Sequence, residues 1–510
     1  MKYFLGVDVG SSAIKLTLLT EEGIIVATSS REYETYYPRV AWAEQDPESW
    51  VTGFVESFRA LVRNTGVNPN EIKALCPSSA THTSVLLDEE CKPVRRVIFW
   101  TDQRSVAETQ ALQQDYGDYI FNKCYNYPEP MWTLPQIQWV MKNEPEIYKK
   151  TKRILFAKDY IRYRICPVYC TDYIDALGSM FMDAETSTWD PKLCAMIGFK
   201  PEDMPKIVKP SDVIGTVCPE MAELTGLSRD TQVVAGASDT ALEVFAAGAV
   251  RPGQMTVKMA TAGRICVMTE KAYPNRLLVN YRCVVDGLWY PGTGTRSCAS
   301  SYRWFKDSFG QYESELSKKS GGKESSYDFL NKGAADVPLG AEGLFFHPYL
   351  LGEFVPYRDP YLRASFVGAS MKHGKGHFVR AVMEGVAFSL LDCLHVIREL
   401  NMPVGNEPAR GLGGGAQSPM WRGILCDVLG LPIAKAEVDD SSFGAAMFAA
   451  VATGAFKDPV EAADRCIKIK EISQPNMENH KRYQDYFVVY KQIQAALQPI
   501  YHDLHRLQEG

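Results

Sequence analysis

The stretch Gly6-Val7-Asp8-Val9-Gly10-Ser11-Ser12, close to the amino terminus, decides the fold. Phe4–Val9 is apolar and predicts a buried strand. Gly10-Ser11-Ser12 predicts a tight turn, and Ala13–Leu19 alternates apolar and polar residues, as a return strand does. Ile24–Ser29 adds a third strand after a second turn. We therefore expect a β-meander at the start of the chain.

A second stretch of the same design follows in the middle of the chain. Met255–Ala260 predicts a strand, Thr261-Ala262-Gly263 a small-residue turn, and Arg264–Thr269 the return strand. The segment Gly248–Gly253, with its Arg-Pro-Gly run, is a breaker and predicts the main domain boundary. One architecture used twice is the simplest interpretation. We expect an α/β protein of two large domains, 1–248 and 249–510.

Helix signals lie between and after these hairpins. Asp46-Pro47 predicts a helix start, with Asp as the cap and Pro in the first helical position. A core-facing stripe with helical spacing follows it, formed by Trp50, Phe54, Phe58 and Leu61. Apolar residues from Phe378 to Leu394 predict a long amphipathic helix, and the polar segment Lys306–Ser326 a surface helix or excursion.

Composition excludes several classes of protein. The 510 residues carry 55 Lys and Arg against 61 Asp and Glu, a net charge of −6, which disfavours nucleic-acid binding. No uncharged apolar run reaches the ~18 residues that span a bilayer, so we expect no membrane partner. The 13 cysteines include no Cys-x-x-Cys pair, which disfavours a zinc site or a disulfide framework. We expect a cytoplasmic protein.

Two carboxylates follow predicted strands and are candidates for chemistry. Asp8, with the donors of Gly10-Ser11-Ser12 behind it, suits a magnesium ion and phosphate oxygens; the alternative is an ordinary hairpin with a capping Asp. Asp239 ends the strand Gln232–Gly236 through Ala237-Ser238, ahead of the helix-compatible Ala241–Ala247. It suits the base that deprotonates a hydroxyl during phosphoryl transfer, and it also suits a helix N-cap.

A glycine-rich segment and one histidine leave more than one interpretation open. Gly411–Ala416 would let backbone approach a base or a phosphate, and it also fits the dinucleotide signature of a NAD-dependent oxidoreductase, with Glu437 and Asp439 as ribose acids. Against that, Pro408–Leu412 is a poor, short strand. His82 lies in a polar loop, where its imidazole binds either a sugar hydroxyl or solvent.

Motifs in one fixed order run through nearly the whole chain. They are Gly6–Ser12, Trp42–Pro47, Trp100–Arg104, Lys158–Tyr160, Asp175–Ser179, Gly236–Asp239, Pro348–Glu353, Arg380–Ala387, Gly413–Ala416 and Phe443–Ala446. In this order they resemble the FGGY family of carbohydrate kinases, and within it the xylulokinases most closely.

The resemblance implies two actin-like (ribonuclease-H-like) domains with an ATP and sugar cleft between them. Asp239 would be the catalytic base, and Asp8 would help to hold magnesium, with Asp239 as a second candidate ligand. The implied sugar-binding residues are Thr81, His82, Trp100, Asp102, Asp239 and Thr240. The implied ATP-binding residues are Gly10, Ser11, Ser12, Lys15, Thr261, Ala262, Gly263, Gly413, Gly414, Gly415, Ala416 and Gln417. ATP and Mg²⁺ are the implied cofactors, and a homodimer is the candidate assembly.

Departures from the xylulokinase pattern keep the substrate open. This chain has Ala80-Thr81-His82-Thr83 where those enzymes usually have Gln-Met-His-Gly, and Thr240 where they have Asn. Lost or moved hydrogen bonds in a sugar pocket shift specificity strongly. D-xylulose is the first expectation; gluconate, L-ribulose, L-fuculose and a polyol such as glycerol are alternatives. A sugar sensor without catalysis is a further hypothesis, which the presence of Asp239 disfavours.

Overall fold

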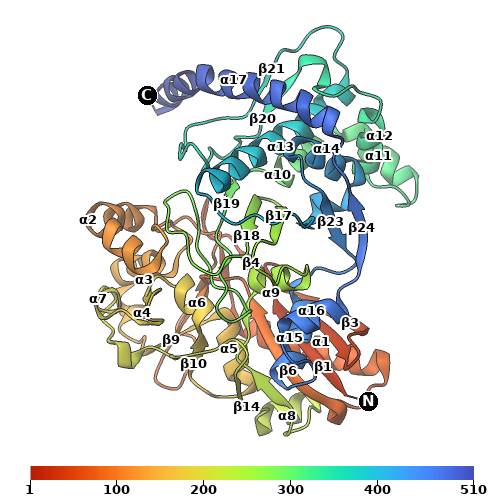
Figure 1. Ribbon diagram of the computed structural model, residues 1–510. Helices are drawn as coiled ribbons and strands as arrows, with labels where there is room; N and C mark the ends of the chain where they lie inside the picture. Colours follow the sequence, from red (N-terminus) through yellow and green to blue (C-terminus); the bar gives the residue numbers. More distant parts are fainter. Residues whose placement is uncertain (1, 510) are drawn as a thin grey trace. The chain divides into compact units, whose positions relative to one another are not determined.

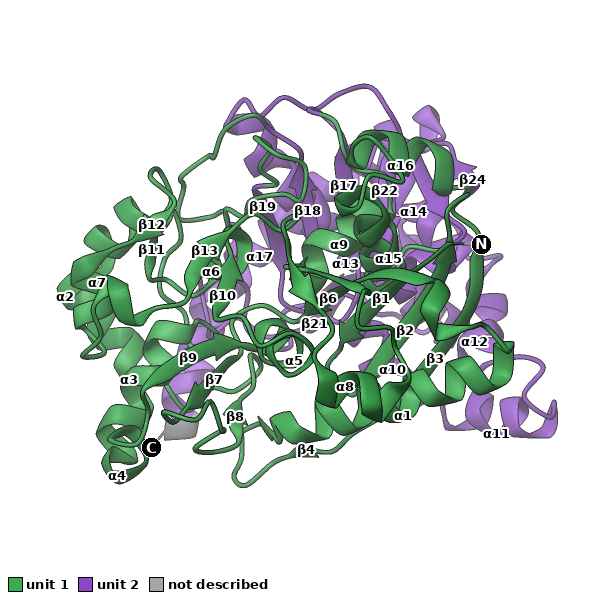
Figure 2. Cartoon of the chain, turned by 90° about the horizontal axis from the view of Figure 1, so that it is seen from below, with its two compact units in different colours: residues 1–251, 270–290, 438–468 green, residues 252–269, 291–437, 469–510 purple. Residues whose placement is uncertain are grey.

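A computed structural model describes residues 2–509 of the chain. It contains two compact units that are interleaved along the sequence (Figure 2). Unit 1 contains the chain up to Arg251 together with Glu270–Tyr290 and Val438–Lys468. Unit 2 contains Pro252–Thr269, Pro291–Glu437 and the chain from Ile469 onward. Each unit is an α/β structure built on its own sheet.

The elements of both units are labelled in chain order (Figure 1). Those of unit 1 are β1 (Tyr3–Val9), β2 (Ala13–Thr20), β3 (Ile25–Glu32), β4 (Thr35–Tyr36), β5 (Glu44–Gln45), α1 (Pro47–Thr65), η1 (Pro69–Glu71), β6 (Ile72–Ser79), β7 (Ser84–Leu87), β8 (Val97–Ile98), α2 (Val106–Cys124), α3 (Thr133–Asn143), α4 (Pro145–Tyr148), β9 (Arg153–Phe156), α5 (Ala157–Ile165), β10 (Cys170–Asp172), α6 (Tyr173–Gly178), β11 (Met182–Asp183), β12 (Thr188–Trp189), α7 (Pro191–Ala195), η2 (Pro201–Asp203), β13 (Lys206–Val208), β14 (Val213–Thr216), α8 (Pro219–Thr225), β15 (Gln232–Val234), β16 (Ala237–Ser238), α9 (Asp239–Ala246), α15 (Ser441–Ala452) and α16 (Pro459–Cys466). Those of unit 2 are β17 (Met255–Met259), β18 (Gly263–Val267), β19 (Gly292–Thr295), α10 (Ala299–Phe309), α11 (Gln311–Lys319), α12 (Ser326–Ala334), η3 (Ala341–Gly343), β20 (Phe345–His347), β21 (Ser365–Val367), α13 (Lys375–Glu399), β22 (Ala409–Leu412), η4 (Gly414–Gln417), α14 (Pro419–Leu429), β23 (Ile433–Ala436), β24 (Ile469–Ser473) and α17 (Met477–Glu509).

The two main sheets have the same topology, which confirms the predicted duplication. In unit 1 the strand order is β14-β15-β6-β1-β2-β3, and in unit 2 it is β24-β23-β22-β17-β18-β19. In each, a three-stranded antiparallel meander leads back to a parallel strand, β6 beside β1 and β22 beside β17. The predicted hairpins therefore form the same part of both units.

Helix α1 follows directly from its sequence signals. The Asp46 side chain accepts a hydrogen bond from the backbone N–H of Glu48, Pro47 occupies the first turn, and Gly66 ends the helix in the left-handed conformation. The four predicted stripe residues are all buried in the core of unit 1. Each such side chain contributes about 1.5–3 kcal/mol by leaving water.

Helix α15 comes from late in the chain yet belongs to unit 1. It packs on β1, β6 and α9, and Figure 1 shows the blue helix beside the red and orange strands. The backbones approach so closely that a Cβ added at Gly6 would lie 1.9 Å from the carbonyl oxygen of Ser442. Glycine is required at this strand position because any side chain would push the helix away.

Two expectations for unit 2 need correction or refinement. The helix predicted as amphipathic is α13, and it is buried on nearly all sides because other helices and β20 cover it. A helix buried all round has no polar face. The polar segment around Lys306–Ser326 forms the end of α10 and all of α11, followed by a loop that leads into α12.

Two expectations drawn from composition concern the whole chain. All 13 cysteines are free thiols, and 12 of them are buried. Among the described residues 2–509, no helix is both long and apolar enough to cross a membrane.

Candidate functional site

Three parallel strand ends in unit 1 bring the two predicted carboxylates into one region. Along β1, β6 and β16, Asp8 pairs with Ser78, and Ser78 pairs with Ala237. Asp239 follows β16 directly. Because β6 separates the other two strands, Asp8 lies two strand spacings, roughly 10 Å, from Ala237, and Asp239 follows two residues later. Residues 231 positions apart in sequence thus share one edge of the sheet.

Asp8 is a partly buried carboxylate that accepts hydrogen bonds from two serine hydroxyls. Ser78 Oγ donates to Asp8 Oδ1 at 2.5 Å, and the hydroxyl of Ser441 also donates to this carboxylate. Burial raises the pKa of Asp8 above its usual value, and the nearby charge of Asp440 raises it further, against these hydrogen bonds and the charge of Lys15. A cation beside Asp8 would stabilise the ionised form of its carboxylate.

The donor set beside Asp8 fits magnesium bound in the way that kinases use it. Mg²⁺ keeps most of its water and needs only one or two carboxylates plus phosphate oxygens. Asp8 and Asp440 supply two carboxylates that sense each other's charge. Within residues 2–509 no cluster of three or more acidic, His or Cys ligands forms a dedicated metal cage. The residues fit a metal that arrives with a phosphate ligand.

Asp239 is the first residue of α9, and the cap of this helix is Ser238. Ser238 Oγ accepts a hydrogen bond from the backbone N–H of Ala241, so the sequence-based alternative that Asp239 is the N-cap is wrong. Asp239 Oδ1 accepts from the backbone N–H of Thr240 at 2.6 Å and from Thr240 Oγ1 at 3.2 Å. These donors fix the orientation of a carboxylate that could act as a general base.

His82 is buried, so the alternative of a solvent-facing imidazole is wrong. Its Nδ1 lies 2.7 Å from the carbonyl oxygen of Gly178, and its Nε2 lies 3.0 Å from the hydroxyl of Tyr281. The ring packs edge-on against Trp132. The close approach of Gly178 to this loop requires glycine, because a Cβ there would lie 2.5 Å from a methyl carbon of Thr81. Both ring nitrogens are therefore engaged by the protein, which fixes the loop that carries Thr81.

Asp102 is also fully engaged. Its Oδ1 accepts from the backbone N–H and the Nε of Arg104, and its Oδ2 accepts from the backbone N–H of Ala43 and from Arg104 Nη2. Four donors fill the acceptor sites of a carboxylate. Trp100, two residues earlier, packs on a small cluster of Ala43, Ala80 and Phe99. Asp102 thus fixes the shape of the loop, whereas the side chain of Trp100 in the same loop is partly exposed.

The predicted phosphate turn in unit 1 exposes the side chains of Ser11 and Ser12. The Gly10 N–H donates to the carbonyl oxygen of Ala13 and closes the hairpin. Lys15, on the return strand, forms an ion pair with Asp440 at 2.9 Å. Burial raises the pKa of Asp440, but the Ser442 hydroxyl and Lys15 together lower it below its usual value. Lys15 is thereby held next to Asp8 and the turn.

The predicted ATP-binding residues of unit 2 also come together. Gly413 has a φ of 80°, and a Cβ on it would lie 2.8 Å from the carbonyl oxygen of Met259. The glycine-rich segment therefore packs against the end of β17, next to the turn that carries Thr261 and Ala262. Gly263 is not part of this turn, since it begins β18 and is buried. The carbonyl oxygens of Ala260 and Thr261 accept hydrogen bonds from the first residues of α10.

The dinucleotide interpretation of the same glycines fails on geometry. Gly414–Gln417 forms the 3₁₀-helix η4, and α14 begins only at Pro419, capped by Ser418. A dinucleotide-binding fold places a helix N-terminus directly after the glycine turn. The segment Ala409–Leu412 is nevertheless a true strand, paired in parallel with both β17 and β23.

Sequence reasoning missed two sets of residues at the strand ends. Asp440 and Ser441 reach Asp8 only through the packing of α15. Lys158 donates its backbone N–H to Ser79 Oγ at 2.9 Å, and its buried ammonium group lies within 3.4 Å of three carboxylates, those of Asp159, Asp172 and Asp175. The motifs that contain Lys158 and Asp175 were the available signal.

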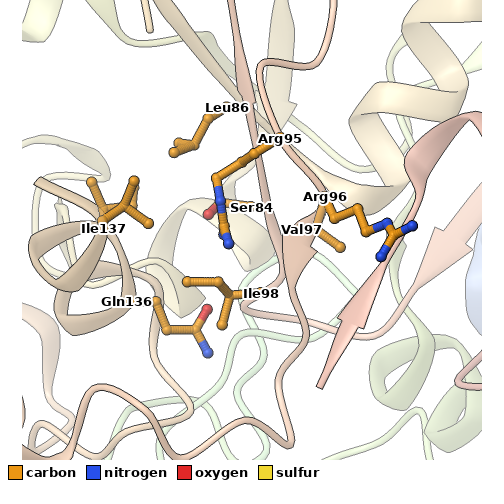
Figure 3. Close-up of a pocket in the computed structure, with 9 residues that line it drawn as sticks. Ser84, Leu86, Arg95, Arg96, Val97, Ile98, Gln136 and Ile137 are labelled. Carbon is orange, nitrogen blue, oxygen red and sulfur yellow. The ribbon is translucent and has the colours of Figure 1, made fainter. Parts of the chain in front are cut away.

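A small cavity in unit 1 contains none of these residues (Figure 3). It lies between β7, β8 and α3, and Gln136 and Ile137 are among the residues that line it. Arg96 extends away from it and stacks on Tyr36 at 3.5 Å. The cavity is therefore separate from the predicted site residues.

Comparison with known proteins points to one family over nearly the whole chain. The models of the N-terminal and C-terminal domains of the FGGY family of carbohydrate kinases match residues 3–246 and 265–453. The chain is 31% identical to the xylulose kinase of Bacillus subtilis, over 97% of each chain, and 29% identical to the gluconokinase of Bacillus licheniformis, over 100% of this chain and 98% of that one. The crystal structure of xylulose kinase from Rhodospirillum rubrum matches with a TM-score of 0.89 and 26% identity, over 98% of this chain and 100% of that one.

These matches confirm the predicted actin-like α/β fold and the predicted carbohydrate kinase family. The chain belongs to the FGGY family of carbohydrate kinases and is a phosphotransferase that acts on a sugar hydroxyl.

Proposed function

We propose that the enzyme transfers the γ-phosphate of ATP to the primary hydroxyl of D-xylulose, forming xylulose 5-phosphate. The observation that carries this proposal is the register that puts Asp8 and Asp239 at the ends of β1 and β16, on either side of β6. The choice of D-xylulose rests on similarity to xylulose kinases over nearly the whole of both chains.

Asp239 acts as the general base in this proposal. Its carboxylate takes the proton of the sugar hydroxyl as that oxygen bonds to the γ-phosphorus, and the bond from phosphorus to the bridging oxygen of ADP breaks. Two donors from Thr240, its backbone N–H and its hydroxyl, hold the carboxylate in place. One carboxylate with a fixed orientation is sufficient for this step.

Asp8 and the turn after β1 receive the phosphates and the metal. When bound, magnesium would neutralise charge on the phosphate oxygens. Asp8 would hold it directly or through water, with Asp440 at the same place and Asp239 as the further candidate ligand. Lys15 supplies a positive charge next to the turn. These local groups offset the net charge of −6, which by itself repels ATP.

Each unit also contains further residues that we propose as substrate contacts. In unit 2, the turn with Thr261 and Ala262 would bind phosphate, and Gly413–Gln417 would bind adenosine. In unit 1, Thr81, Trp100 and Thr240 are the proposed direct contacts with the sugar, and His82 and Asp102 shape the pocket.

The 13 free thiols suit a reducing compartment, so we place the enzyme in the cytoplasm.

A substrate panel tests this proposal. ADP release is coupled to a spectrophotometric readout with D-xylulose, L-ribulose, L-fuculose, gluconate and glycerol, each with and without Mg²⁺. We expect the highest kcat/KM with D-xylulose and no turnover without the metal. A higher kcat/KM with gluconate would reject D-xylulose and keep the kinase. Sugar binding without turnover of any substrate would reject the kinase activity.

A further inference from the structure

The backbone of the turn after β1 is held in one orientation by hydrogen bonds from residues outside the hairpin. The Tyr33 hydroxyl donates to the carbonyl oxygen of Gly10, and the Tyr33 backbone N–H donates to the carbonyl oxygen of Ser12. Gln45 Nε2 donates to the carbonyl oxygen of Ser11 at 2.8 Å. The carbonyl oxygens of all three turn residues are therefore bonded to the protein.

Gln45 is built into the protein so that only its donor end can face the turn. The side chain is fully buried. Trp50 Nε1 lies 3.1 Å from Gln45 Oε1, and an indole N–H only donates, so the amide oxygen must face Trp50. The amide nitrogen is then left for Ser11, and it also donates to Thr35 Oγ1 at 2.9 Å. Trp50, in the first part of α1, thereby determines which end of the Gln45 amide faces the turn.

The orientation of this turn determines which charge it can bind. A peptide unit whose carbonyl oxygen points into the protein presents its N–H on the other side, and such N–H groups attract anions. Within the part of the chain that the structure describes, the N–H groups of Ser11 and Ser12 have no protein acceptor. Their side chains are exposed as well. A flipped peptide would instead place a carbonyl oxygen against a phosphate.

We propose that Gln45 and Tyr33 are positioning residues for phosphate binding: they hold the carbonyl oxygens of Gly10-Ser11-Ser12 inward so that the turn offers only donors to the phosphates of ATP. This inference rests on the proposed function, since it assigns that turn to ATP. Neither residue contacts the nucleotide. Their effect is confined to ligands that carry phosphate, and adenosine and the sugar are bound independently of them.

The test compares ligands with and without phosphate. Calorimetric titration measures Kd for Mg-ADP, adenosine and D-xylulose with wild type, Gln45→Met and Tyr33→Phe. Methionine is neutral and similar in length but cannot donate to Ser11, and phenylalanine lacks only the hydroxyl that bonds Gly10. We expect Kd for Mg-ADP to rise at least tenfold in Gln45→Met and less in Tyr33→Phe, with Kd for adenosine and D-xylulose within twofold of wild type.

The matched control is Gln494→Met, which alters a buried glutamine of α17 whose amide donates to Gln498. It should leave all three Kd values unchanged. Unchanged Mg-ADP binding in folded Gln45→Met or Tyr33→Phe would overturn the inference, as would equal weakening of Mg-ADP and adenosine. If Gln45→Met does not fold, Tyr33→Phe decides by the same criteria. A wild type that binds no adenine nucleotide would overturn the proposed function itself.

Discussion

Glu353 gives unit 2 a pH-dependent stability that one substitution should remove. The side chain is buried, and this burial raises its pKa to about 7, against the lowering effect of hydrogen bonds from Thr295 Oγ1 and the backbone N–H groups of Arg296 and Phe354. In the unfolded chain the same carboxyl titrates near its usual value of 4.5. The protonated form is therefore the one that the folded unit prefers.

The sign and size of the effect follow from this difference. The contribution of the protonated carboxyl to stability is complete below about pH 4.5, declines as the pH rises, and is lost above about pH 7. A shift of one pKa unit corresponds to about 1.4 kcal/mol, so the loss amounts to about 3 kcal/mol. Glu353→Gln keeps the acceptor for the two backbone N–H groups and cannot ionise. It should equal wild type near pH 4.5 and exceed its stability by up to about 3 kcal/mol at pH 8.

Urea unfolding at half-unit steps from pH 4.5 to 8 measures this difference, followed by fluorescence and circular dichroism. Glu315→Gln, an exposed carboxyl of α11 in the same unit, is the control and should follow wild type at every pH. The reasoning is refuted if Glu353→Gln and wild type keep a constant difference in unfolding free energy across this range.

Two further predictions concern the packing that builds the site. Gly6→Ala should lower the free energy of unfolding by about 3 kcal/mol or more, because the added Cβ meets the backbone of α15 at 1.9 Å. Gly423→Ala in α14, where an added Cβ meets nothing within 4 Å, should instead stabilise by about 0.5–1 kcal/mol. Equal effects of the two substitutions in thermal unfolding would contradict this. Lys158→Met should cost about 3–5 kcal/mol in urea unfolding, because it removes the buried cation beside Asp172 and Asp175 and leaves Asp159 with Arg162 alone. A cost below about 1 kcal/mol would show that the carboxyls are already neutral.

Local signals predicted much of the fold. The hairpin around Gly10 and helix α1 after Asp46 form where the sequence places them, because turn glycines, caps and apolar spacing act over a few residues. The duplicated hairpin was predicted, and the structure adds that the whole strand order is common to the two sheets. The full burial of α13 was missed because the sequence shows which residues are apolar but not which other elements pack on the helix. The same apolar stripe occurs in a helix covered on one face and in a helix covered on all faces.

Long-range packing decided what the sequence could not. Asp440 and Ser441 reach Asp8 because α15 packs on β1, and nothing in the local sequence pairs residues more than 400 positions apart. His82 stands in a polar run and is nonetheless buried, since Tyr281 and Gly178 take up its ring nitrogens. The fold and the family could be predicted from the order of the motifs. The hydrogen-bond partners of His82 and Asp102 could be learned only from the three-dimensional structure.

The most direct test of phosphoryl transfer at these strand ends is the turnover of Asp239→Asn. Asparagine keeps the size and the contact with Thr240 but cannot take a proton. With D-xylulose and Mg-ATP, we predict that kcat falls by a factor of about 10² to 10⁴ while the calorimetric Kd for the sugar stays within about twofold. Asp230→Asn, at an exposed carboxylate before β15, should behave as wild type. Wild-type turnover by Asp239→Asn would contradict the assignment of the base and the mechanism built on it.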